Sequence, residues 1–153
     1  MNPVIADAGA LVALLDRSDA WHQWAVDTFK TLIPPLLTCE AVLAETWHLL
    51  GSAPPSRNAL SRLHREGILL VAFDFQTESS AVWHLLEKYA DVPMDFADAC
   101  LVRMTELHPT AQVWTTDSDF RVYRRNGRQS HTVPCHAVKR RRGSQPVRRG
   151  GHW

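Results

Sequence analysis

Short apolar runs alternate with longer amphipathic stretches along most of this chain. Four runs have the length and the aliphatic, partly β-branched composition of strands, at residues 3–6, 36–38, 68–73 and 111–115. Between them, apolar residues recur at helical spacing, and proline, glycine or a capping aspartate stands near many of the ends. The pattern predicts helices at residues 8–15, 19–32, 40–50, 57–66, 77–89 and 95–107, then a last helical turn and a short strand near residues 132–133.

Strands that alternate with helices predict an α/β fold. The crossovers between parallel strands are right-handed, so the expected architecture is a three-layer α/β/α arrangement with a mostly parallel central sheet. The run at residues 68–73 is expected to be a fully buried strand, and Asp19 is expected to cap the helix that follows it. In such sheets, ligands gather at the carboxyl ends of the strands.

Length and composition indicate one domain. The chain has 153 residues and 45% hydrophobic content, which suffices for one packed core. We expect this domain to span residues 1–138. Residues 139–153 are rich in glycine and arginine, and we expect them to form a flexible basic arm.

The charge of the chain is unevenly distributed. Residues 139–153 hold six of the seventeen basic residues, and no acidic residue follows Asp119, so the rest of the chain has 11 basic against 16 acidic residues. An acidic body with a basic arm suggests a metal site and a polyanionic partner. A solvated, solubilising tail explains the arm equally well.

The sequence favours a cytoplasmic protein without membrane spans. Its apolar runs fall far short of the roughly 18 residues that a span needs, and the N-terminus lacks the basic and apolar regions of a signal peptide. The cysteines are odd in number and widely spaced, so we expect buried free thiols at Cys39, Cys100 and Cys135. Five tryptophans fall in apolar segments and are expected in the core or a subunit interface rather than as base-stacking platforms: Trp21, Trp24, Trp47, Trp83 and Trp114.

Four acidic residues stand where ionised side chains are costly. Asp7 and Asp117 each end a strand-like run, so both should reach the same edge of a parallel sheet. Glu45 and Asp98 each share a helical face with apolar residues, and Asp95 lies one turn before Asp98. Because acids are rarely buried unless they are paired or bind metal, these four are candidate ligands of one cation.

Each acid also has a separate structural interpretation. Asp7 could cap the helix that begins at residue 8, Asp117 could cap the next turn, Glu45 could pair with an arginine, and Asp98 could be a cap or a rim residue. However, lysine occurs only at positions 30, 88 and 139, so few cations are available for pairing. One shared metal site would explain all four acids together. Clustered carboxylates suit Mg²⁺ or Mn²⁺, which can activate water against a phosphodiester without a nucleophilic side chain.

At these residues the sequence resembles the PIN-domain nucleases, and within them the small VapC-type toxins of toxin–antitoxin pairs. Four segments carry the resemblance, in the order and spacing of the family: Val4-Ile5-Ala6-Asp7-Ala8-Gly9-Ala10-Leu11, Ala41-Val42-Leu43-Ala44-Glu45, Pro93-Met94-Asp95-Phe96-Ala97-Asp98-Ala99 and Thr115-Thr116-Asp117-Ser118-Asp119-Phe120. The match runs through most of the domain and does not include the arm.

The resemblance implies a PIN-like fold and a Mg²⁺- or Mn²⁺-dependent endoribonuclease. By resemblance, Asp7, Glu45, Asp98 and Asp117 are the catalytic and metal-binding acids, Asp95 and Asp119 are secondary candidates for the metal, and the hydroxyl of Thr115 or Thr116 supports the site. The implied partners are an RNA substrate, an antitoxin protein and a second copy of the chain. The alternatives are an RNA-processing or decay nuclease without an antitoxin, and a non-catalytic RNA-binding module.

Overall fold

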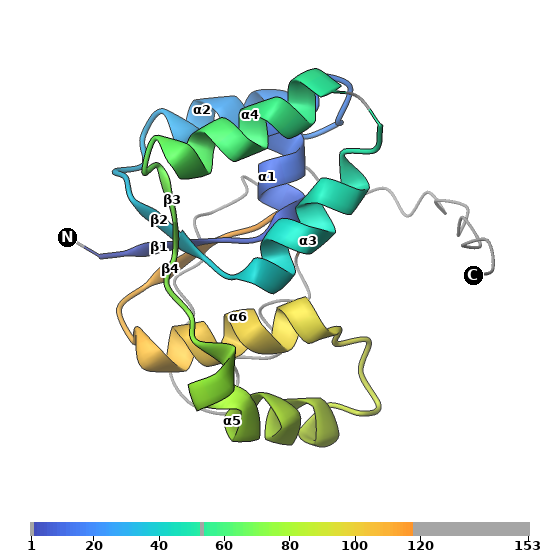
Figure 1. Cartoon of the computed structure of the whole chain (residues 1–153), viewed down its shortest axis with the longest axis vertical. Helices are drawn as coiled ribbons and strands as arrows, with labels where there is room; N and C mark the ends of the chain where they lie inside the picture. Colours follow the sequence, from blue (N-terminus) through green and yellow to red (C-terminus); the bar gives the residue numbers. More distant parts are fainter. Residues whose placement is uncertain (1, 53, 118–153) are drawn as a thin grey trace.

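The computed structural model describes residues 2–52 and 54–117. Strands and helices alternate along this part of the chain, as the sequence pattern predicts (Figure 1). The elements are β1 (Val4–Ala6), α1 (Ala8–Leu15), α2 (His22–Phe29), β2 (Leu36–Thr38), α3 (Glu40–Leu49), α4 (Pro54–Arg65), β3 (Leu69–Val71), α5 (Phe75–Lys88), α6 (Phe96–Leu107) and β4 (Gln112–Trp114).

The strands form a parallel, four-stranded sheet in the order β3-β2-β1-β4. Strand β1 lies in the interior of the sheet, where Ile5 is in register with Leu37 on one side and Val113 on the other. Helices α1, α2 and α4 cover one side of the sheet, and α5 and α6 lie on the other side (Figure 1). The predicted three-layer α/β/α fold is therefore confirmed.

The tryptophans divide between the core and the surface. Trp114 is fully buried on β4, and its ring packs against Trp24 at 6.3 Å and Phe29 at 5.9 Å between centroids. Within the described residues, its indole nitrogen is the one buried side-chain polar atom without a hydrogen-bond partner. Trp47 and Trp83 are exposed, so of the two expected positions, core or subunit interface, the core is excluded for these two and the subunit interface stays a prediction.

Two predicted elements are shorter than expected. Strand β3 covers only Leu69–Val71, and Leu70 is exposed because β3 lies at the edge of the described sheet and has a strand on one side only. Helix α2 begins at His22, and Asp19 is not its N-cap: the side chain of Asp19 accepts from the backbone N–H of Trp21 at 2.8 Å and closes a turn before the helix.

Two other helices begin earlier than the pattern predicts. Helix α4 starts at Pro54, a position where the missing N–H of proline costs nothing. Helix α5 starts at Phe75 because the carboxylate of Asp74 accepts from the backbone N–H groups of Gln76 and Thr77. The elements predicted near residues 132–133 and the arm at residues 139–153 lie outside the described residues.

Cys39 and Cys100 are buried free thiols, as expected, and Cys135 lies outside the described residues. Among the described helices, none combines the length and the apolar character that crossing a membrane would require.

Candidate active site

The edge of the sheet where β1 and β4 end holds two of the predicted acids. Ala6 is in register with Trp114, and the backbone N–H of Asp7 donates to the carbonyl of Trp114 at 3.0 Å. Asp7 follows β1 directly, and Asp117 follows β4 after two threonines. The two acids thus reach the same edge of the sheet, as the sequence pattern predicts.

Asp7 is buried, with only 6% of its surface exposed. Its Oδ1 accepts from the backbone N–H of Ala8 at 2.6 Å, which caps α1, and its Oδ2 accepts from the hydroxyl of Thr115 at 2.7 Å. Burial raises the pKa of Asp7, and the charges of Asp117 and Asp95 raise it further, whereas the two hydrogen bonds lower it. Each carboxylate oxygen still has a lone pair for another ligand.

Thr115 links the two acids at this edge. Its hydroxyl donates to Asp7 and accepts from the backbone N–H of Asp117 at 2.9 Å. The neighbouring Thr116 packs so closely on Gly9 that a Cβ at position 9 would clash with its Oγ1. The start of α1 and the segment after β4 therefore hold each other in place. Of the two threonines considered from the sequence, Thr115 contacts the acids.

Removing the hydroxyl of Thr115 should misplace Asp7 without removing any acid. For the endoribonuclease activity that the resemblance implies, we expect Thr115→Val, which keeps the shape of the side chain, to lower the cleavage rate roughly tenfold, as the loss of a hydrogen bond that orients a ligand does. Thr115→Ser keeps the hydroxyl and should restore most of the rate. The measurement is the cleavage rate against Mn²⁺ concentration. Equal rates for the Val and Ser variants would show that the hydroxyl does not position the site.

Helices α3 and α6 supply the other acids. Glu45 lies in the middle of α3 and is half-buried. At the start of α6, Asp95 and Asp98 form a capping box: Asp95 Oδ1 accepts from the backbone N–H of Asp98 at 2.8 Å, and Asp98 Oδ2 accepts from that of Asp95 at 3.1 Å. This exchange fixes the first turn of α6 and with it the position of Asp98.

The electrostatics connect acids that come from different elements. Burial raises the pKa of Glu45 to about 7, with further contributions from the charges of Asp95, Asp7 and Asp117. Burial also raises the pKa of Asp98 to about 7, and the charges of Asp95 and Asp7 add to this. Carboxyl groups that raise one another's pKa lie close enough to repel, so the region favours a bound cation.

The structural interpretations of the acids hold in part. Asp7 does cap α1, and Asp98 does belong to a cap. Glu45 has no arginine partner within the described residues, where the ion pairs join Arg62 to Glu66 and Arg103 to Glu78 and Glu106. Capping accounts for single hydrogen bonds of Asp7 and Asp98. It does not account for the half-buried Glu45 or for the mutual repulsion.

The donor set fits a hard divalent ion, although the acids do not form a closed cage. In the part of the chain that the structure describes, no three His, Cys, Asp or Glu side chains are close enough together to hold a metal ion. Mg²⁺ commonly binds through one or two carboxylates, several waters and the phosphates of a substrate, so a closed cage is not required. Asp119, a secondary candidate, lies outside the described residues.

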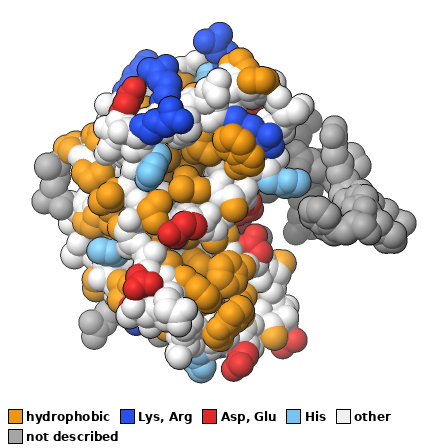
Figure 2. All heavy atoms as spheres, viewed as in Figure 1, with side chains coloured by type: hydrophobic (Ala, Val, Ile, Leu, Met, Phe, Trp, Pro, Cys, Tyr) orange, Lys and Arg blue, Asp and Glu red, His pale blue; other side chains and the backbone are white. Residues whose placement is uncertain are grey.

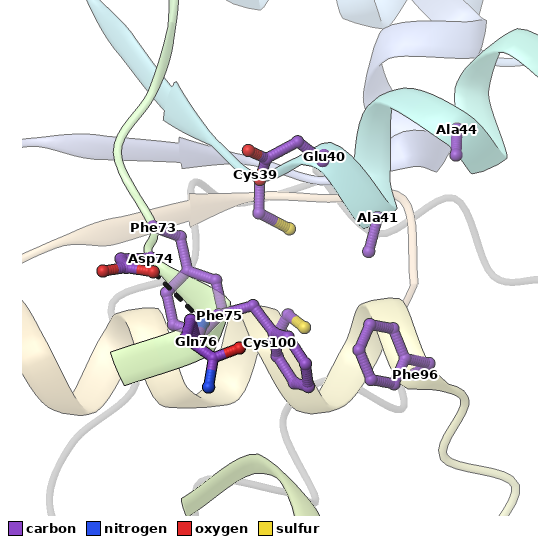
Figure 3. Close-up of a pocket in the computed structure, with 10 residues that line it drawn as sticks. All are labelled: Cys39, Glu40, Ala41, Ala44, Phe73, Asp74, Phe75, Gln76, Phe96 and Cys100. Carbon is purple, nitrogen blue, oxygen red and sulfur yellow. Dashed lines mark hydrogen bonds between the residues drawn. The ribbon is translucent and has the colours of Figure 1, made fainter. Parts of the chain in front are cut away.

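A pocket of about 540 Å³ is lined in part by α3 and α6, the helices that carry Glu45 and Asp98, and the sequence patterns did not single it out (Figure 3). Its walls include Phe73 and Phe75, from the end of β3 and the start of α5, and Phe96 and Cys100 from α6. The sequence feature that could have indicated the pocket is Phe96, an aromatic residue between two acids in the first turn of a helix.

Comparison with known proteins supports the fold. A sequence model of the PIN domain matches residues 4–126. Among solved structures, the chain is similar to the crystal structure of VapC20 from Mycobacterium tuberculosis, a toxin that cleaves the sarcin-ricin loop. The identity is 21% and the TM-score 0.70, and the similarity covers 78% of this chain and 93% of that one. No curated protein matches the chain.

Proposed function

The chain belongs to the PIN domain family, and on this premise we propose that it is a metal-dependent endoribonuclease that hydrolyses RNA phosphodiester bonds. The observation that carries the proposal is a set of acids that come from separate elements and raise one another's pKa. Within the described residues, Glu45 has no arginine partner that would offset this repulsion. A partly buried set of repelling carboxylates is costly unless a cation binds there.

We assign Asp7, Glu45, Asp98 and Asp117 as the residues that would hold Mg²⁺ or Mn²⁺, with Asp95 and Asp119 as further candidates. The bound ion would supply Lewis-acid activation of the phosphodiester and of a water molecule. Within the chain, Thr115 orients Asp7, and the capping box with Asp95 orients Asp98. The mechanism requires no nucleophilic side chain.

We further propose that the chain is the toxin of a toxin–antitoxin pair and acts in the cytoplasm. Support comes from the similarity to the fold of VapC20, a toxin that cleaves an RNA loop. The implied partners are an antitoxin protein and a second copy of the chain. A processing or decay nuclease would share the chemistry and lack the antitoxin. A small gene for a DNA-binding protein next to this one would favour the toxin.

Incubation of the purified protein with total RNA tests the nuclease proposal. Cleavage should appear with Mg²⁺ or Mn²⁺, stop with EDTA and return when metal is restored. Binding of RNA without any metal-dependent cleavage would instead indicate the non-catalytic RNA-binding module.

The basic arm is expected to contribute to RNA binding. Its arginines can neutralise phosphates and release counterions, which makes binding salt-dependent without sequence specificity. Truncation after Val138 removes six basic residues. It should weaken RNA affinity and flatten the plot of log affinity against log salt concentration, with a slope change of up to about four for single-stranded RNA. An unchanged slope would assign the arm to solubility or to protein contacts.

A further inference from the structure

The pocket lined by residues of α3, α5 and α6 has the size and lining of a ligand site. Its volume is about 540 Å³, within the range of roughly 300 to 1,000 Å³ that is common for small-molecule sites. Ala41, Ala44 and Cys39 form the wall on the side of α3, and Phe75 and Phe96 face them from the other side (Figure 3). The lining is thus largely apolar and aromatic.

The aromatic wall is part of an exposed cluster of rings. Phe75 contacts Phe96 at 5.2 Å and Trp83 at 5.8 Å between centroids, and Trp83 and Phe96 are 5.7 Å apart. Phe96 is 39% exposed and Trp83 is 51% exposed, although large rings usually gain stability from burial. Figure 2 shows hydrophobic side chains gathered on this face of the molecule next to acidic ones. The cluster can therefore offer ring surface to a ligand.

Two helices that line the pocket, α3 and α6, also carry proposed catalytic acids, although none of the four acids lines the pocket itself. On α6, Phe96 lies between Asp95 and Asp98 in the first turn. On α3, Ala41 lies one turn before Glu45, and Ala44 directly precedes it. The same two helices thus form the walls of the pocket and carry two of the acids. A polymer that runs across these two helices would contact both the acids and the pocket.

The charges in the pocket disfavour a phosphate there. Glu40 and Asp74 both line it, and both are exposed. Negative side chains repel phosphate but tolerate the uncharged part of a nucleotide, and the donor groups of a base can hydrogen-bond to carboxylates. An aromatic ring stacks on any base, since each base has a π face.

We propose that this pocket binds an unpaired base of the RNA, next to the phosphate held at the carboxylates, with Phe96 as the stacking platform. The inference rests on the proposed nuclease function for its substrate, but the pocket itself can be tested without cleavage. In this proposal, Phe96 and the neighbouring rings stack on bases, a role that the sequence analysis did not expect of the tryptophans.

The first test uses free nucleosides, which carry no phosphate and need no metal. Saturation-transfer NMR of the full-length protein with each of the four ribonucleosides at millimolar concentration should show transfer mainly to base protons. Phe96→Ala should abolish the signal. Trp47→Ala, which removes an exposed ring that instead stacks with Arg57, should leave it unchanged. Thermal melting of each variant verifies folding. Absence of base signals with the wild type would overturn the proposal.

The second test uses a single-stranded oligoribonucleotide that the protein cleaves. Phe96→Leu keeps an apolar side chain without a π face, and it should raise KM about tenfold with little change in kcat, while Phe96→Tyr should resemble the wild type. An abasic substitution next to the cut should raise KM for the wild type and have no further effect on Phe96→Leu.

These outcomes separate the pocket from the nuclease activity. Cleavage with unchanged KM in Phe96→Leu would overturn the base pocket and leave the nuclease proposal standing. Nucleoside binding without metal-dependent cleavage would support the pocket and reject the nuclease. If Phe96→Ala weakened only the binding of a partner protein, the pocket would be a protein docking site and the proposal would fail.

Discussion

Asp98→Asn is expected to lower metal-dependent RNA cleavage by about a hundredfold or more, because it removes one charge from the shared ligand set. The change keeps the fold. In the structure, Asp98 Oδ2 accepts from the backbone N–H of Asp95, and the amide oxygen of asparagine can accept the same hydrogen bond. The loss of activity would therefore report on charge and not on the cap of α6.

The other acids should behave alike. Asp7→Asn, Glu45→Gln and Asp117→Asn are each expected to remove most of the activity, whereas Asp119→Asn should have a milder effect. Asp16→Asn is the matched control: Asp16 is held by hydrogen bonds to Ser18, which lower the pKa of its carboxyl, and it follows α1 away from the acids. Its removal should leave cleavage unchanged.

The measurement is single-turnover cleavage of one RNA by each variant, with Mn²⁺ and with EDTA. Cleavage by Asp98→Asn at the wild-type rate, under conditions where EDTA stops the wild type, would show that the assignment of the metal centre is wrong. A similar loss in Asp16→Asn would point to a general effect of the substitutions.

The fold could be predicted from the sequence because local signals agreed with one another. The apolar run before Asp7 and the alanine-rich stretch after it fixed a strand, a bend and a helix, and the register of β1 with β4 then brought Asp7 and Asp117 to one edge. The edge position of β3 could not be predicted in this way. A run of apolar residues has the same pattern in a central strand and in an edge strand. The exposure of Leu70 follows from the place of β3 in the strand order, which the local pattern does not contain.

The roles of single residues in the site were harder to predict. From the sequence, Asp7 could be a helix cap or a metal ligand. In the structure, one of its carboxylate oxygens caps α1, and the other accepts a hydrogen bond from the hydroxyl of Thr115. The pocket depends on contacts between segments far apart in the chain. Phe75 and Phe96 meet in space, and no periodic pattern connects the start of α5 with the start of α6.

The second large effect concerns stability without metal, which should fall as the pH rises from about 5 to about 8. The folded protein raises the pKa of both Glu45 and Asp98 to about 7, above their ordinary values of 4.5 and 3.8. Between these limits the folded state therefore binds more protons than the unfolded chain, and the free energy of unfolding decreases with pH. Above the raised pKa the curve should level off.

Metal should counteract this loss by binding the folded state alone. For Mn²⁺ at roughly ten to a hundred times its dissociation constant, the expected gain at pH 7.5 is on the order of 1 to 3 kcal/mol, or about 3 to 10 °C in melting temperature. At pH 5 the gain should be smaller, because protonated carboxyls compete with the ion.

Asp98→Asn separates repulsion from other causes of a pH-dependent stability. The substitution removes one repelling charge and keeps the hydrogen bond to Asp95, so in EDTA at pH 7.5 the variant should melt at a higher temperature than the wild type and gain less from Mn²⁺. Its advantage should shrink towards pH 5, where folded Asp98 is protonated in the wild type. Asp16→Asn should lack this advantage, because its carboxyl has a lowered pKa in the folded state and its charge is favourable there.

Thermal unfolding of the three proteins at pH 5 and 7.5, with EDTA or Mn²⁺, provides the comparison. If Asp98→Asn were less stable than the wild type in EDTA at pH 7.5, and Mn²⁺ did not raise the melting temperature of the wild type, Asp98 would be a structural cap and the carboxylates would not be a cluster that a cation stabilises.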